Sequence, residues 1–404
     1  MGIDLLSNTT GQEMATALKL IAASQSVQAR EALGSVTWSE LARFANDGLI
    51  KSVMDYGDQV TDTWTDNAGE TPVEYSNPFH LAHIEDVELE NGEILKNRPF
   101  FQTHYAQAYP VQFSNCRAFY ACPDGLSAGT YYIEFAQAWS KLTTLQWTFT
   151  LTKDVPAGGR LMGFVAAADN TRTSDTVYVY GADGKTLLET VTATPGSDGT
   201  KLGTLAYTAR GTGDNANCNC MQEAFYGSNR WKTSAARQYL NSAAGKGLWW
   251  TPQDEWDIAP EQLATIPGWL NGCSEDFINS LKKIKVVTYT NTVTFDGSAD
   301  ITYDRVTLPS LQQRYVTPQI TGEGDAFEYW KRRLGRTTPQ EIGTSGALDA
   351  AKTYNIKNHS EAVYERFRSA TRGSASNVWS AYSAGYVSNY SARYALRFAP
   401  FVVI

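Results

Sequence analysis

Three histidines and two cysteines in the first third of the chain could in principle build a metal site. His80, His83 and His104 precede Cys116 and Cys122, and imidazole nitrogen and thiolate sulfur are donors that zinc prefers. Their spacing fits no structural zinc pattern, however, and isolated histidines in a strand-rich region are more often hydrogen-bonded to the backbone. We therefore expect no metal ion and no cofactor.

A second group combines acidic and aromatic side chains. Residues 254–257 read Asp-Glu-Trp-Asp and follow Trp249 and Trp250, so carboxylates lie beside a stacking platform, as in glycoside hydrolases. Neighbouring side chains on a strand or loop point apart, and a solvated acidic loop beside buried tryptophans is the competing interpretation. Cys218 and Cys220 are either a soft-metal or redox pair or two loop thiols.

No local motif supports catalysis. The sequence contains no serine nucleophile elbow, phosphate-binding loop, HExxH helix or EF-hand loop. We expect no catalytic residue, and therefore not an enzyme.

The most informative stretch is Ser369–Leu396. Its 28 residues include seven Ser, six Ala, four Tyr and Trp379, but no Lys, Asp or Glu. This composition is typical of an antibody paratope, where aromatic rings give rigid contact area and small polar residues give adaptable hydrogen bonds. The alternative is that the four tyrosines, which recur at every fourth position, form the buried side of a helix or of a long strand.

Overall composition sets the limits for the elements that position these residues. The chain has 404 residues, 34 basic and 42 acidic side chains, a net charge of −8 and 42% hydrophobic residues. This length and composition predict two or three packed units. The sparse, odd set of five cysteines predicts no disulfide framework, and neither a signal peptide nor a membrane-spanning segment is expected. An acidic chain without Lys/Arg runs argues against nucleic acid as a partner.

An amphipathic helix is predicted at the N-terminus, over residues 1–34. Thr10 and Glu13 form a capping-box pattern, and Met14, Leu18 and Ile21 follow at helical spacing. The apolar stripe is narrow, so this helix either docks against a partner or neighbouring subunit or folds back on its own domain.

The remainder predicts a body interrupted by an insert. Residues 35–108 begin with a short helix capped near Thr37 and closed by Gly48. Residues 109–210 alternate in the β pattern and contain turn residues, which predicts a sandwich-like all-β insert. Residues 211–404 return to the body after a loop. The expected strands of the insert are 130–135, 145–151 and 176–180.

Within 211–404 the periodicity predicts helices over 228–241 and 270–281 and a strand over 285–295. The apolar face of the first helix comprises Trp231, Ala235, Tyr239 and Leu240. The fold class expected from these elements is α+β, with strands dominating.

From about residue 35 to the end, the chain resembles the variable proteins of diversity-generating retroelements, in particular those of phage tail fibres with a C-type-lectin-like fold. The resemblance rests on several short motifs. They are Gly48-Leu with 56–59, 124–131, 155–159, 196–200, Tyr226-Gly-Ser-Asn229-Arg-Trp231 with 237–241, Phe277 with 283–285, 383–388 and Arg397-Phe-Ala399-Pro400.

The resemblance implies a C-type-lectin-like domain, related to formylglycine-generating enzymes, with a variable region at about 370–394. It also implies a host-receptor-binding tail protein, located in the virion and assembled as a homotrimer. The expected partners are a host cell-surface receptor, protein or glycan, and other tail proteins bound through the N-terminal helix. The ligand contacts implied are Thr371, Arg372, Ser374, Asn377, Trp379, Ala381, Tyr382, Tyr386, Asn389, Tyr390, Ala392, Arg393 and Tyr394.

Some family features are missing. The Trp-x-Arg-Ser-Pro run of relatives is replaced by Arg366-Phe-Arg368-Ser369-Ala370. The calcium-site signatures of sugar-binding lectins are absent, and Cys273 has no cysteine partner near the C-terminus, so oxidase activity is not carried over. A structural virion component without variable binding, a formylglycine-generating-like enzyme and a tail glycan hydrolase remain the alternatives.

Overall fold

The computed structural model describes residues 36–115, the strands and a few turn residues between 119 and 193, and residues 228–404 apart from 254–256, 258, 293–294 and 375. It is a mixed α/β structure with 36% strand and 17% helix. All strands in its sheets pair antiparallel. This confirms the α+β class with strands dominating. Within the described part, no helix is both long and apolar enough to cross a bilayer.

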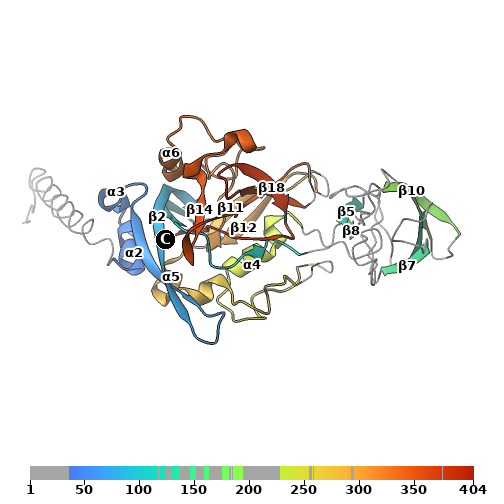
Figure 1. Ribbon diagram of the computed structural model, residues 1–404, viewed down its shortest axis with the longest axis horizontal. Coiled ribbons are helices and arrows are strands. Elements are labelled where there is room, and N and C mark those ends of the chain that lie inside the picture. Colours follow the sequence, from blue (N-terminus) through green and yellow to red (C-terminus); the bar gives the residue numbers. More distant parts are fainter. Residues whose placement is uncertain are drawn as a thin grey trace, which may run out of the picture.

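The central sheet joins the two body segments that the sequence separates. Its order is β1-β2-β3-β20-β13, and the C-terminal strand β20 pairs with β3 on one side and β13 on the other. The first segment therefore cannot complete this sheet alone (Figure 1). The strands are β1 (Gln59–Asp66), β2 (Val73–Glu88), β3 (Ile94–Thr103), β13 (Val306–Thr307) and β20 (Phe401–Val403).

Helices cover both faces of this sheet. Trp38 of α2 (Trp38–Asn46) meets Phe79 of β2 edge to face, whereas the next residue of β2, His80, stacks on Tyr329 of α6 (Glu328–Leu334). Successive side chains of a strand point to opposite faces, so α2 and α6 lie on opposite sides of β2. This explains the unbroken run of buried residues in the middle of β2.

The first predicted helix is confirmed. Thr37 is the N-cap of α2 and forms a capping box with Glu40, and Gly48 takes a positive φ of 69° just beyond the helix end. A further short helix, α3 (Ile50–Val53), follows.

The predicted helix over 228–241 is wrong in its extent. A 3₁₀ turn, η2 (Trp231–Thr233), precedes a shorter helix, α4 (Ala235–Leu240), and Ser234 separates them. The Ser234 hydroxyl accepts a hydrogen bond from the Arg237 N–H. Ser234 is therefore the N-cap of a new helix and interrupts the one predicted. The predicted apolar face is confirmed, since its four residues are buried.

Two further boundaries also require correction. The helix expected over 270–281 is a 3₁₀ turn, η3 (Trp269–Gly272), followed by α5 (Glu275–Ser280), because Ser274 caps a new helix start. The strand expected over 285–295 is β11 (Ile284–Tyr289), paired with β12 (Ala299–Asp304). The chain leaves the ladder at Asn291, whose side-chain amide donates to Asn229 Oδ1.

The C-terminal part forms a second, smaller sheet. It consists of β16 (Glu365–Ala370), β17 (Asn377–Ala381) and β18 (Val387–Ser391), in that order. The short strand β19 (Ala395–Leu396) pairs with β4 (Val111–Gln112), so the body extends past the expected boundary at residue 108. A hairpin of β14 (Thr353–Asn355) and β15 (Asn358–Val363) precedes the sheet, after the 3₁₀ turns η4 (Thr344–Gly346) and η5 (Asp349–Ala351).

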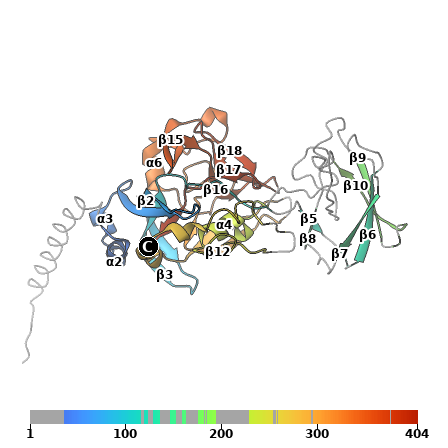
Figure 2. The same cartoon turned by 60° about the horizontal axis from the view of Figure 1, so that its bottom comes forward.

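The three strands expected in the insert are present. They form a four-stranded antiparallel sheet in the order β10-β9-β6-β7, and β5 and β8 form a separate pair. Figures 1 and 2 show both groups of strands at one end of the molecule. The predicted N-terminal helix, the loop at 211–220, Cys116, Cys218 and Cys220 lie outside the described residues. The strands are β5 (Phe119–Cys122), β6 (Gly129–Phe135), β7 (Gln146–Leu151), β8 (Gly159–Met162), β9 (Asp175–Tyr180) and β10 (Leu187–Ala193).

Candidate binding face on the C-terminal sheet

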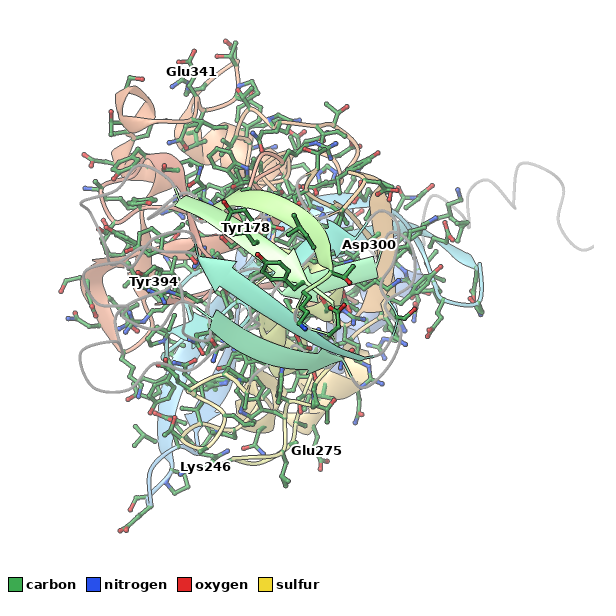
Figure 3. The ribbon with its side chains drawn as sticks, turned by 90° about the vertical axis from the view of Figure 1, so that its right-hand side faces the viewer. Tyr178, Lys246, Glu275, Asp300, Glu341 and Tyr394 are labelled. Atoms are coloured by element: carbon green, nitrogen blue, oxygen red, sulfur yellow. The ribbon has the colours of Figure 1, made fainter. Side chains whose placement is uncertain are left out.

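Five tyrosine rings form one continuous cluster on the C-terminal sheet. The ring of Tyr382 lies 4.5 Å from Tyr364 and stacks on Tyr386 at 4.6 Å between centroids. Tyr390 connects Tyr382, at 6.1 Å, to Tyr394, at 5.0 Å. Tyr394 is 45% exposed and the other four are half-buried, and Figure 3 shows Tyr394 at the left of the body. We call these five residues the tyrosine face.

A hairpin, and neither a helix nor a single strand, brings the tyrosines together. Tyr382 and Tyr386 flank the β17–β18 turn, where the Tyr382 N–H donates to the Tyr386 carbonyl over 2.8 Å. Gly385 closes this turn with a φ of 86°, and a Cβ there would collide with the Leu348 carbonyl oxygen. The spacing of four residues therefore reflects the turn, and both structural alternatives from the sequence are wrong.

The buried guanidinium of Arg366 binds the backbone that carries the tyrosine face. Nη1 donates to the Tyr390 carbonyl over 2.6 Å and to the Val378 carbonyl over 3.4 Å. Nη2 donates to the carbonyls of Ser391, at 3.0 Å, and Tyr394, at 3.1 Å. Burial lowers the pKa of Arg366 to about 9, so the side chain remains charged at neutral pH. One side chain thus fixes the backbone that carries two of the five rings.

Four of the thirteen expected contact residues lie in the interior. Strand pairing places Trp379 opposite Asn389 and the preceding Val378 opposite Tyr390, so Trp379 and Tyr390 point to opposite faces of the sheet. The Trp379 ring packs in the small core beneath the sheet, and its indole N–H donates to Gln319. These four side chains are not available to a ligand in this structure. Their exposed fractions are Ala392 0%, Ala381 2%, Trp379 5% and Thr371 8%.

The polar members of the expected set are half-buried and bound to the scaffold. Arg372 donates to the carbonyls of Thr290 and Gly297. The Asn377 side-chain amide donates to Asn389 Oδ1 over 3.2 Å, and the Asn377 N–H donates to the Ser374 hydroxyl. In the β17–β18 register Asn377 and Asn389 share the face of Trp379, so their side chains lie on the side of the sheet opposite to Tyr390.

Arg393 extends the tyrosine face toward a groove. Its guanidinium carbon lies 4.8 Å from the centroid of the Tyr394 ring, and Nη2 donates to the Tyr394 hydroxyl. Both residues line a cavity of about 560 Å³. Its other lining residues are the polar Gln112, Asn115 and Glu261 and the apolar Ala259 and Ala395. Aromatic rings, a cation and an adjoining groove with apolar and polar walls together suit a binding surface.

Sequence reasoning missed two residues of this site. Tyr364 precedes β16 and lies outside the 370–394 stretch, and Arg366 was considered only as a departure from a family motif. Tyr364, Arg366 and Arg368 occupy alternate positions at and in one strand, β16. This spacing indicates that their side chains share one face, and it was the signal available in the sequence.

Among the described residues, the three histidines considered as a possible zinc site do not assemble as a ligand set. Cys116 and the side chain of Cys122 lie outside the described part of the chain. His80 contacts Tyr329 and the edge of His104, 6.0 Å away, and His104 Nδ1 lies 3.0 Å from Gln59 Nε2. His83 lies instead in a group with Glu85 and Asp325, the one set of three potential ligands among the described residues.

Replacing His80 with phenylalanine is expected to reduce the acid sensitivity of the fold. His80 is 1% exposed, neither ring nitrogen has a hydrogen-bond partner among the described residues, and burial lowers its pKa well below 6.5. Above pH 6.5 the ring is neutral in both the folded and the unfolded chain. Below this pH the unfolded chain binds a proton that the folded chain does not, so the free energy of unfolding falls.

Urea unfolding of the wild type and His80→Phe between pH 5 and pH 8 measures this contribution. We expect equal or greater stability of the variant at pH 8, because two unpaired polar atoms are removed, and a smaller loss toward pH 5. Parallel pH profiles of the two proteins would contradict the assignment.

The described residues of the acidic and aromatic segment at 249–257, and Cys273, do not form a catalytic arrangement. Trp249 is 3% exposed, and its indole N–H donates to the Ile266 carbonyl, so it is a core residue. Of the acidic run, Asp257 is described, and its carboxylate accepts from the Gln253 N–H. Burial raises the pKa of the Cys273 thiol well above its usual value, which leaves it protonated and a poor nucleophile.

A family model bears on this part of the chain. Residues 205–401 match the model of a domain of unknown function, DUF6273. No curated protein and no solved structure matches the chain. The matched segment contains β16, β17, β18 and β19, but it lacks β1, β2 and β3. The segment therefore depends on the preceding residues to complete the central sheet.

Proposed function

We propose that this chain is a receptor-binding protein of a phage or prophage tail, which recognises a host cell-surface ligand through the tyrosine face. The observation that carries the proposal is the continuous contact of five partly exposed tyrosine rings over a buried arginine. Tyrosine combines a large rigid surface with a polar hydroxyl, and few rotamers are lost on binding. Such a surface binds without catalysing a reaction.

The proposed body is a C-type-lectin-like domain carrying a β insert. In support, the chain has antiparallel sheets with few helices, and its C-terminal strand lies inside the central sheet, between β3 and β13. Burial of the chain terminus in a sheet gives a rigid platform for the hairpin that bears the tyrosines.

The proposed assembly is a homotrimer in the virion, attached to other tail proteins through residues 1–34. Several identical faces on one fibre bind a cell surface with avidity, because the second and third contacts are intramolecular events. Modest affinity at each face is then sufficient for adsorption.

Sequencing the 3′ end of the gene in many copies from one population tests the proposal. We expect substitutions to concentrate at codons whose side chains reach the surface, and to be absent at the buried Trp379, Ala381 and Ala392. Truncating a buried tryptophan costs about 3–5 kcal/mol, and enlarging a buried alanine typically costs about 1–3 kcal/mol. The changes should fall at adenine positions. Uniform low variation over the region would reject a diversified face in favour of a fixed adhesin or a structural protein. The codons expected to vary are those of Arg372, Ser374, Asn377, Tyr382, Tyr386, Asn389, Tyr390, Arg393 and Tyr394.

A further inference from the structure

A cluster of one imidazole and two carboxylates lies away from the tyrosine face. His83 and Glu85 project from β2, two residues apart and therefore on the same face. Asp325 reaches them from the segment that leads into α6. One ligand atom of each residue lies within 4.8 Å of the others. Packing of α6 against β2 thus brings together groups that are far apart in the sequence.

His83 and Glu85 lack the partners that buried polar groups usually have, and Asp325 lies at the surface beside them. His83 is 9% exposed, its Nδ1 has no hydrogen-bond partner, and its Nε2 lies 3.7 Å from Glu85 Oε2, too far for a hydrogen bond. Among the described residues, Lys and Arg form no ion pair with either Glu85 or Asp325. The carboxylates of Glu85 and Asp325 repel each other, and the effect of Asp325 on the pKa of Glu85 is larger than the opposing effect of Arg368. This repulsion favours a bound positive ion.

The nearest candidate counter-ion is engaged elsewhere. Arg368 interacts electrostatically with Glu85, but its guanidinium donates to the Leu308 and Glu323 carbonyls and to Gln313 Oε1. Both terminal nitrogens of Arg368 are therefore bound outside the cluster, while its Nε–H has no partner among the described residues.

We infer that His83, Glu85 and Asp325 bind a divalent transition-metal ion. Ligands at about 2.1 Å from a tetrahedral ion lie roughly 3.4 Å apart, close to the 3.7 Å between His83 and Glu85. Asp325 is exposed and follows Gly324, so its side chain can move the remaining distance. A neutral imidazole with two carboxylates suits zinc or manganese, whereas calcium prefers oxygen ligands alone.

Solvent reaches two of the three proposed ligands. Glu85 lines a cavity of about 300 Å³ together with Glu323, Gly324 and Arg368, among others, whereas His83 and Asp325 do not line it. Asp325 is itself exposed, so water can reach an ion held between the two carboxylates. The site does not depend on the proposed receptor binding and is tested separately from it.

Metal titration of the full-length protein, stripped with a chelator, tests the inference. Mn²⁺ is titrated first, with the free ion followed by electron paramagnetic resonance, because manganese disfavours thiolates and the cysteines do not compete. Zn²⁺ is titrated second, by calorimetry. The variants are Glu85→Gln and Asp325→Asn. The matched control is Asp86→Asn, which removes a neighbouring carboxylate that is bonded to Lys96 and the Asn97 N–H.

We expect a single ion per chain, affinity reduced by about tenfold or more in each ligand variant, and little change in Asp86→Asn. Asp325 is exposed, so Asp325→Asn tests the site without threatening the core. The inference is overturned if neither ion binds the wild type. It is also overturned if the two ligand variants retain wild-type affinity, or if Asp86→Asn loses as much affinity as they do.

Discussion

Alanine at both Tyr386 and Tyr394 is expected to weaken binding to host cells by a factor of about 700, while the protein stays folded. Buried aromatic contacts at an interface typically contribute about 2 kcal/mol or more each, and 1.4 kcal/mol corresponds to a tenfold change in affinity. Tyr394 is exposed and Tyr386 is half-buried, and neither residue belongs to a core cluster of the body. The measurement is the amount of labelled protein bound to host cells as a function of concentration.

The control is Tyr303→Ala, which removes a half-buried tyrosine from β12, outside the tyrosine face. It should bind like the wild type. Size-exclusion chromatography with light scattering measures the oligomeric state of the double variant. This shows whether the two tyrosines bind the receptor or hold the subunits together. If the double variant loses its oligomeric state along with adsorption, the tyrosine face is a subunit interface, and the chain is a structural virion component.

Replacing Arg366 with methionine should destabilise the fold by about 3 kcal/mol or more. The guanidinium satisfies carbonyls of β17, of β18 and of the turn after β18. Methionine fills a similar volume but donates no hydrogen bond, and each carbonyl left unpaired in the interior costs about 1–3 kcal/mol. Chemical unfolding of the two proteins gives the difference in the free energy of unfolding.

Two further variants show whether the carbonyl contacts are responsible. Arg366→Lys keeps the charge but cannot reach all four carbonyls, so we expect an intermediate loss. Arg393→Met removes an arginine from the same segment at the surface, and its effect should stay within about 0.5 kcal/mol. An Arg366→Met protein as stable as the wild type would show that water or a rearranged backbone satisfies the carbonyls. The tyrosine face would then not depend on this residue.

Local signals in the sequence determined much of the secondary structure. Thr37 and Glu40 form a capping box across one turn, so the start of α2 depends on neighbouring residues alone. The alternating runs of the insert gave β6, β7 and β9 for the same reason. Errors arose where a serine cap divided a periodic stretch, at Ser234 and Ser274, because the apolar pattern continues through both interruptions.

The sequence by itself also determined where a binding surface should be sought, since the composition of 369–396 is independent of how the chain folds. Only the tertiary structure decided which residues reach that surface. Trp379 and Tyr390 are both aromatic, so the sequence favours neither as a surface residue. The β17–β18 register directs Trp379 to the interior and Tyr390 to the opposite face. Tyr364 and Arg366 join the site from β16 and its approach, and Asp325 meets His83 through the packing of α6 on β2. Such contacts depend on strand pairing and helix packing between distant segments, which composition and local periodicity do not encode.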